Sequence, residues 1–318
     1  MKRMLNLLAG TALAVAGISA TAGDSRAEFI NVLTGGTSGV YYPLGVALAE
    51  LYAGGIEDAR AQVQATKASV ENLNLLSAGR GEVAFALGDS VMAAWAGDRE
   101  AGFQSELTNL RAIGGIYDNY IQIVAERAAG IDSLEDLKGK TISVGAPASG
   151  TELNARAIFA AAGMSYDDMS RVEFLPYAES AELIKNRQLQ STLQSSGLGA
   201  AFINDLATTH EINIVEIPAS VVEAVGAPYK ATAIPAGTYP GQDEEVPTAA
   251  VTNILVTSEA VSEETVYLMT KLMFENIPRL TAAHSAAATL DPAEAVQNLP
   301  IPLHPGAERY YRETGVIE

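Results

Sequence analysis

The sequence contains no cysteine in 318 residues. Disulfide bonds, thiol catalysis and a lipid-modified cysteine anchor are therefore excluded. Basic residues are also few: 20 lysines and arginines stand against 38 aspartates and glutamates, which gives a formal net charge of −18 at pH 7. Because a surface of this sign repels nucleic acid and anionic lipid, we expect neither as a partner. An anionic ligand would depend on short-range donors inside a cleft, since salt screens charges beyond roughly 8 Å.

Long apolar runs are absent beyond the N-terminus, so we expect no membrane-embedded segment in the mature chain. The first residues have the pattern of an export signal. Lys2 and Arg3 precede an apolar stretch at 5–16, which is shorter than the ~20 residues needed to span a bilayer. Small-x-small patterns end at Ala22 and Ala27. We predict cleavage after Ala27, with Ala22 as the alternative, and export to the bacterial periplasm.

The common signatures of catalysis are also missing. The loop at 36–39 is one residue short of a Gly-x-Ser-x-Gly nucleophile elbow, and Gly197-Leu-Gly199 lacks the third glycine of a dinucleotide fingerprint. We interpret the latter as a loop. His210, His284 and His304 are scattered, without a second metal ligand at helical or turn spacing. We therefore expect no enzyme activity, no metal and no cofactor.

Two glycine-rich loops, Thr34–Pro43 and Gly145–Glu152, carry most of the remaining information. Each follows a strand-like run, at 30–33 and at 141–144, and each opens a helical segment. The first backbone N–H groups of a helix have no intrahelical partner and lie at the positive end of the helix dipole. Two such loops predict a pair of half-sites that close on one small anionic ligand.

Strand-like and helix-like segments alternate from residue 28 onward. A helix is predicted at 43–52, a strand at 61–65, a helix capped by Ser69, and a strand at 82–87. This alternation is typical of an α/β fold in which helices cover both faces of a βαβ sheet.

Extended runs at 110–124 and 248–256 interrupt the alternation and enclose a second α/β unit. We interpret them as hinge strands that join two lobes. After the second run, Ser262 is expected to cap a helix with Met269 and Met273 on its buried face. The predicted organisation is a signal peptide at 1–27, a discontinuous first lobe at 28–118 and 249–318, and a second lobe at 119–248.

Small hydroxyl side chains gather in the glycine loops and at helix starts. Each serine or threonine there has an ordinary explanation as a helix cap. Their presence in both predicted lobes favours a binding role, because hydroxyl and backbone N–H groups surround a carboxylate without supplying a catalytic group. One of Tyr41 and Tyr42 is expected in the core and the other at the cleft.

At these loops the chain resembles the TAXI subfamily of solute-binding proteins of TRAP (tripartite ATP-independent periplasmic) transporters. The resemblance runs over nearly the whole mature length. It is carried, in this order, by Leu33–Gly45, Ala68–Leu73, Asp136–Lys140, Gly145–Glu152, Ile234–Gln242 and Ile301–Ala307. It implies a two-lobed, type II-like periplasmic binding protein that captures an organic anion such as glutamate, 2-oxoglutarate or a similar dicarboxylate, and passes it to TRAP membrane permease subunits.

Carried over position by position, the resemblance implies a ligand pocket formed by both lobes. The implied ligand-binding residues are Thr37, Ser38, Tyr41, Ser69, Asp89, Ser149, Gly150, Thr151, Ser195, Ser196 and Gly197. The chain departs from the family pattern at Lys67 and Ala68, where glycine is frequent. A ligand-sensing periplasmic protein or an exported enzyme on the same fold remains the alternative.

Overall fold

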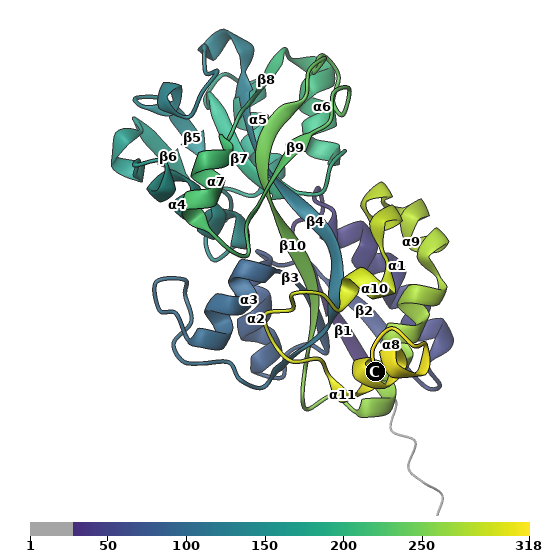
Figure 1. Ribbon diagram of the computed structural model, residues 1–318. Helices are drawn as coiled ribbons and strands as arrows, with labels where there is room; N and C mark the ends of the chain where they lie inside the picture. Colours follow the sequence, from purple (N-terminus) through teal and green to yellow (C-terminus); the bar gives the residue numbers. More distant parts are fainter. Residues whose placement is uncertain (1–27) are drawn as a thin grey trace, which may run out of the picture.

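The computed structural model describes residues 28–318, so the predicted signal peptide lies outside the described residues. The chain forms two lobes joined by two long strands (Figure 1). All ten strands belong to one mixed sheet with the order β2-β1-β3-β10-β4-β7-β5-β6, while β8 pairs with β4 and β9 with β10. The predicted α/β fold with two lobes is confirmed. None of the helices in residues 28–318 combines the length and apolar character needed to cross a membrane.

The elements have the following bounds. The strands are β1 (Phe29–Leu33), β2 (Arg60–Gln64), β3 (Val83–Leu87), β4 (Leu110–Glu126), β5 (Thr141–Ser143), β6 (Arg171–Glu173), β7 (Ser191–Ser196), β8 (Ile212–Val215), β9 (Lys230–Ile234) and β10 (Val246–Ser258). The helices are α1 (Tyr41–Gly55), α2 (Ser69–Ser77), α3 (Gly88–Ala96), α4 (Gly150–Ala161), α5 (Tyr177–Lys185), α6 (Ala201–Thr209), α7 (Ala219–Val225), α8 (Glu263–Glu275), α9 (Ile277–Ala283), α10 (Pro292–Ala295) and α11 (Pro305–Glu313).

Strands β4 and β10 run antiparallel to each other through both lobes (Figure 1). In the lobe that contains the N-terminal strands, which we call lobe 1, β10 pairs with β3. In the other lobe, lobe 2, β10 pairs with β9, while β4 pairs with β7 and β8. The register between β4 and β10 shifts at Asn253/Ile254 and again at Leu255/Val256. Such irregularities bend a strand locally, and these lie on the lobe 1 side, in the part of β10 that pairs with β3.

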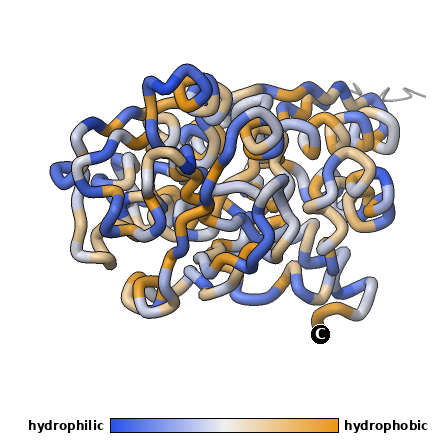
Figure 2. Tube along the Cα trace, turned by 90° about the horizontal axis from the view of Figure 1, so that it is seen from above, coloured by the Kyte–Doolittle hydropathy of each residue, from blue (hydrophilic) through white to orange (hydrophobic). Residues whose placement is uncertain are grey.

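Each lobe buries apolar side chains on both faces of its part of the sheet. In lobe 1, one cluster includes Tyr52 and the expected Met269/Met273 stripe, and another includes Leu73 and Phe103. Lobe 2 has its own clusters. Hydrophilic stretches of the chain mark many of the outer turns of the trace (Figure 2). Separate cores allow the lobes to move as units about the two shared strands.

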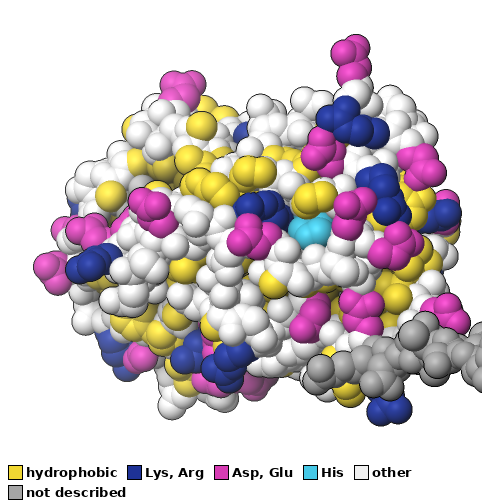
Figure 3. Space-filling view, turned by 90° about the horizontal axis from the view of Figure 1, so that it is seen from below, with side chains coloured by type: hydrophobic (Ala, Val, Ile, Leu, Met, Phe, Trp, Pro, Cys, Tyr) yellow, Lys and Arg dark blue, Asp and Glu magenta, His cyan; other side chains and the backbone are white. Residues whose placement is uncertain are grey.

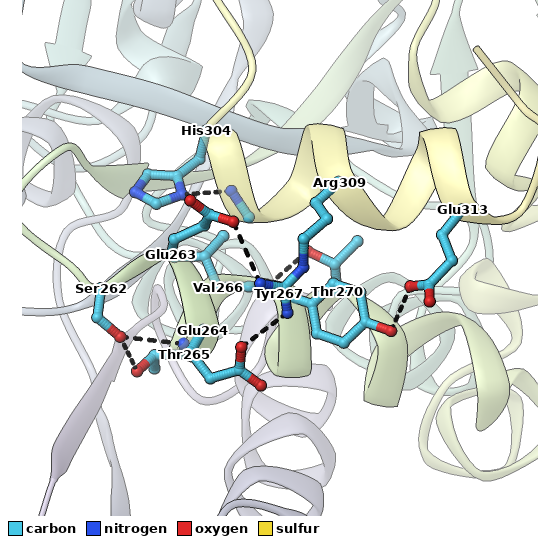
Figure 4. A network of polar contacts seen from close by, with 11 residues as sticks. Ser262, Glu263, Glu264, Thr265, Val266, Tyr267, Thr270, His304, Arg309 and Glu313 are labelled. Carbon is cyan, nitrogen blue, oxygen red and sulfur yellow. Dashed lines mark hydrogen bonds and ion pairs between the residues drawn. The ribbon is translucent and has the colours of Figure 1, made fainter. Parts of the chain in front are cut away.

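The C-terminal helix α11 completes lobe 1 by packing on α8. The Arg309 guanidinium pairs with Glu263 at 3.1 Å and Glu264 at 2.7 Å, and lies 3.9 Å from the centre of the Tyr267 ring (Figure 4). The Tyr311 hydroxyl donates to the Ile113 carbonyl of β4 at 3.0 Å. The exposed ion pairs contribute little free energy, so burial of the apolar side of α11 is its main attachment to lobe 1.

On the face seen from below, acidic side chains are interspersed with Lys and Arg (Figure 3).

Two of the expected helix starts differ in outcome. Ser262 caps α8 as predicted, because its hydroxyl accepts a hydrogen bond from the Thr265 N–H at 3.1 Å. The prediction that Ser69 caps α2 is wrong: Ala68 occupies the cap position and Ser69 is the first helical residue. The Ser69 hydroxyl instead accepts from the Leu87 N–H at 3.1 Å, which ties the start of α2 to the end of β3.

Candidate functional site

A cavity of about 120 Å³ lies between the lobes, beside the crossing of β4 and β10. Lobe 1 contributes its glycine loop and residues 66–68 to the lining, and β4 contributes Tyr117 and Asn119. Lobe 2 contributes the loop before α4, the start of α5 and the end of β7. Gly36 and Lys67 belong to the lining and are exposed, so they mark the mouth. Both glycine-rich loops therefore reach one shared cavity.

Glycines bring the lobes into close contact around this cavity. A methyl group on Gly150 of α4 would lie 2.6 Å from the Ser69 hydroxyl and 2.7 Å from a Leu87 methyl group, both in lobe 1. A methyl group on Gly197 would lie 3.1 Å from the Ala286 methyl group, again across the lobes. The Glu71 N–H of α2 also donates to the Ala148 carbonyl at 3.2 Å. These contacts describe a closed arrangement of the lobes.

A short hydrogen-bonded chain orders the lobe 2 wall. The Tyr177 hydroxyl donates to the Ser195 carbonyl at 2.7 Å and lies 2.6 Å from the Thr151 hydroxyl oxygen. The Ser195 hydroxyl donates to the Asn154 amide oxygen at 2.6 Å. The loop before α4, the start of α5 and the end of β7 are thus held in fixed positions relative to one another.

Three tyrosines, Tyr41, Tyr117 and Tyr177, contribute to the cavity wall. Burial raises the pKa of all three phenols, to about 12 for Tyr177. They are therefore uncharged at neutral pH and act as hydrogen-bonding groups with aromatic faces rather than as bases. The Tyr41 hydroxyl, from the first turn of α1, donates to the Asn253 amide oxygen on β10.

Donors for an anion lie at the start of α4 and at the mouth. The N–H groups of Gly150 and Thr151 precede the first intrahelical hydrogen bond, and Ser149 caps the helix by accepting from the Glu152 N–H at 3.2 Å. The Ser149 hydroxyl hydrogen stays available to a ligand. Within residues 28–318, the Lys67 ammonium forms no ion pair. This set suits a single carboxylate.

Asp89, at the start of α3, lies outside this cavity and joins the lobes at another point. Its carboxylate accepts from the Asn154 amide at 2.6 Å and from the Tyr229 hydroxyl at 2.8 Å, both in lobe 2. Burial raises the pKa of the Asp89 carboxyl, although hydrogen bonds from Tyr229 and Ser90 partly offset the effect. We call Asp89, Asn154 and Tyr229 the interlobe latch. Asn154 connects the latch to the cavity through Ser195.

The expected site residues occupy different places around the cavity. Five of them line it directly: Tyr41, Ser149, Thr151, Ser195 and Ser196. Three others, Ser69, Gly150 and Gly197, form the packed contacts between the lobes, whereas Thr37, Ser38 and Asp89 are not part of the lining. The first loop reaches the cavity through Gly35, Gly36 and Gly39 instead. The binding role of the whole set stays a prediction.

Sequence reasoning missed several residues that shape the site. Tyr177 and Asn119 line the cavity, and Asn154 and Tyr229 complete the latch. Tyr117 was expected only as part of a hinge strand. The alternation of side chains along β4 was the available signal, because it places Tyr117 and Asn119 on the same face.

The comparison with protein-family models identifies the family. The model of the NMT1-like family matches residues 32–315. The chain belongs to the NMT1-like family. Its fold is shared with solved structures of low sequence identity. A structure described as a periplasmic transporter is 10% identical, with 92% of this chain and 94% of that chain covered and a TM-score of 0.55.

Two further structures of similar fold carry more specific descriptions. One is a binding protein component of an ABC phosphonate transporter from Pseudomonas aeruginosa, 12% identical over 82% of this chain and 79% of that chain, with a TM-score of 0.52. The other is a putative L-cystine ABC transporter from Listeria monocytogenes, 12% identical over 80% of this chain and 94% of that chain, with a TM-score of 0.52. At these identities the likeness concerns the fold.

Proposed function

We propose that this NMT1-like chain is a periplasmic solute-binding protein. It captures a small organic anion between its lobes and delivers it to a TRAP-type secondary transporter. Glutamate, 2-oxoglutarate and related dicarboxylates or amino acids are the proposed ligands. The protein releases the ligand chemically unchanged, because the cavity offers hydrogen-bonding groups and protonated phenols rather than a nucleophile with an adjacent base.

The shared cavity is the observation that carries the proposal. Its walls come from both lobes, and two strands, β4 and β10, connect those lobes. Hinge closure of this kind removes water from both sides of a bound molecule, which strengthens each polar contact. The Thr151 N–H group, the Ser149 hydroxyl and the Lys67 ammonium are the proposed carboxylate ligands.

Binding is tested directly with purified residues 28–318 and a panel of organic acids and amino acids. A true ligand at 100 times its Kd stabilises the folded protein by about 2.7 kcal/mol, which a thermal-shift measurement detects. Calorimetry then gives the affinity. The Thr151→Ala variant should bind at least tenfold more weakly, whereas Thr208→Ala, on the exposed face of α6, should bind normally. The absence of binding to every organic anion would refute the proposal.

The transporter partner is a separate part of the proposal. Its support is the motif resemblance to TAXI proteins, whereas the descriptions of two of the three solved structures named above refer to ABC transporters. Reconstitution into vesicles with the candidate permease separates the two. Uptake that follows an ion gradient without ATP supports a TRAP partner. Uptake that requires ATP would remove the TRAP assignment and leave ligand capture intact.

A further inference from the structure

Two polar groups in the β4 wall of the cavity lack a partner. The Tyr117 hydroxyl and the Asn119 amide oxygen are buried and accept or donate no hydrogen bond within residues 28–318. The orientation of the Asn119 amide is set by its other end, because its N–H₂ group donates to the Ser195 carbonyl at 3.0 Å. The Asn119 oxygen is therefore an acceptor that needs a donor, whereas the Tyr117 hydroxyl is free both to donate and to accept.

The hydrogens of two neighbouring hydroxyls are already committed. The Tyr177 hydroxyl donates its one hydrogen to the Ser195 carbonyl. In the 2.6 Å contact between the Tyr177 and Thr151 hydroxyl oxygens, Thr151 must therefore be the donor. The Tyr41 hydroxyl donates its hydrogen to the Asn253 amide oxygen. The N–H₂ group of the same Asn253 side chain donates to the Tyr117 carbonyl at 3.1 Å, which fixes the orientation of the amide. The oxygens of Thr151 and Asn119 are thus left as acceptors.

The charges and the aromatic rings of the cavity wall also favour a ligand group that donates hydrogen bonds. No arginine lines the cavity in the described chain, and the only charged side chain in its lining, Lys67, lies at the exposed mouth. Three tyrosine rings surround the interior, and aromatic faces attract cations, most strongly where water is excluded. The Asn119 acceptor and the aromatic faces favour a cationic hydrogen-bond donor over a second carboxylate in this region.

We infer that this wall, formed by Asn119, Thr151 and the three tyrosines, binds an ammonium group, and that the ligand is a 2-amino acid rather than a 2-oxo acid. The inference rests on the proposed binding function. The carboxylate of the amino acid lies against the start of α4, and its ammonium donates to the unpartnered oxygens of Asn119 and Tyr117. A 2-oxo acid has no hydrogen to donate to the Asn119 amide oxygen, so that buried acceptor stays unpaired.

Matched ligand pairs test this selectivity in the wild-type protein. Calorimetry with L-glutamate against 2-oxoglutarate, and with L-alanine against pyruvate, should show the amino member bound at least about tenfold more tightly in whichever pair binds. Equal or tighter binding of the oxo member would overturn the inference and leave the proposed function standing. If no member of any pair and no other organic anion binds, the proposed function itself fails.

Two variants, each with a matched control, assign the selectivity to the wall. Asn119→Leu removes the unpartnered acceptor and should lower the ratio of amino-acid to oxo-acid affinity about tenfold. Gln194→Leu removes a similar unpartnered amide oxygen on β7 that does not line the cavity, and should leave the ratio unchanged. A structural effect would weaken both ligands together and would not change the ratio.

The second variant removes a single atom and guards against misfolding. Tyr117→Phe deletes a hydroxyl that forms no hydrogen bond within residues 28–318, whereas Tyr52→Phe deletes an equally unpartnered hydroxyl in the lobe 1 core. Tyr117→Phe should weaken amino-acid binding severalfold, and Tyr52→Phe should not. A wild-type ratio retained in both Asn119→Leu and Tyr117→Phe would show that other residues select the ligand, which would refute the assignment.

Discussion

At the scale of single residues, Ala68 occupies a backbone conformation that glycine alone adopts without strain. Its φ is 73° and its ψ is −145°, at the point where the chain enters α2 beside the cavity. Such a conformation costs of order 1–3 kcal/mol for a residue with a side chain. This cost is a physical reason for glycine to be frequent at Lys67 or Ala68 in the TAXI proteins that the chain resembles.

Replacement of Ala68 by glycine should therefore stabilise the protein. Relief of strain exceeds the entropy cost of a glycine, and we expect the free energy of unfolding to rise by about 1 kcal/mol. Urea unfolding of the ligand-free protein measures the change. The control is Ala49→Gly inside α1, where the backbone is helical and the side chain is buried, so stability should fall by at least that amount. A lower stability of Ala68→Gly would contradict the strain argument.

The Asp89 carboxyl predicts a specific dependence of stability on pH. Its pKa in the folded protein is raised above the ordinary value of 3.8, mainly by burial. The folded state therefore takes up this proton first as the pH falls. The contribution of Asp89 to the free energy of unfolding rises as pH falls through the raised pKa and levels off below about 3.8.

The Asp89→Asn variant isolates this contribution. The free energy of unfolding of the wild type minus that of the variant should rise between pH 7 and pH 4, by at most about 1.4 kcal/mol per pH unit. Asp136→Asn is the control of opposite sign, because the hydrogen bond from Ser133 lowers the pKa of Asp136. A flat difference for Asp89→Asn would show that the latch carboxyl does not titrate as its burial requires.

At the scale of elements, the glycine at the first position of α4 sets how closely the lobes approach. Gly150→Ala inserts a methyl group 2.6 Å from the Ser69 hydroxyl, and both Ser69 and Leu87 are held by their own lobe. Closure should be obstructed, and ligand affinity should fall at least tenfold while the fold remains. Calorimetry checks the affinity and circular dichroism the fold. Gly54→Ala, where the added methyl group meets nothing within 4 Å, should bind as the wild type does.

Elements were easier to predict from the sequence than the site. The strand at 110–124, the strand at 248–256 and the cap at Ser262 follow from local patterns of apolar residues and caps, and the structure has each of them within a few residues. Ser69 does not cap α2, because its hydroxyl accepts a hydrogen bond from the N–H of Leu87, which is distant in the sequence. Asn119 and Tyr177 were missed for the same reason: their importance comes from partners on other strands and helices.

At the scale of the whole molecule, the described arrangement is a closed one, held by the latch and by the glycine contacts around the cavity. Ligand binding should shift the population toward this shape. Small-angle scattering should show a smaller radius of gyration with ligand than without, and Gly150→Ala should stay expanded in both conditions. Identical scattering of the wild type in both conditions would contradict hinge closure.

The attachment of α11 has a consequence for how the chain is made. The bond from Tyr311 to Ile113 joins residues 198 positions apart, and the segment around Leu303 pairs with Ala112. The N-terminal lobe therefore cannot finish its core until the last helix has been synthesised, whereas the inserted lobe has all of its strands once β10 has emerged. Strands β1 to β3, although translated before lobe 2, are thus among the last elements to reach their native packing.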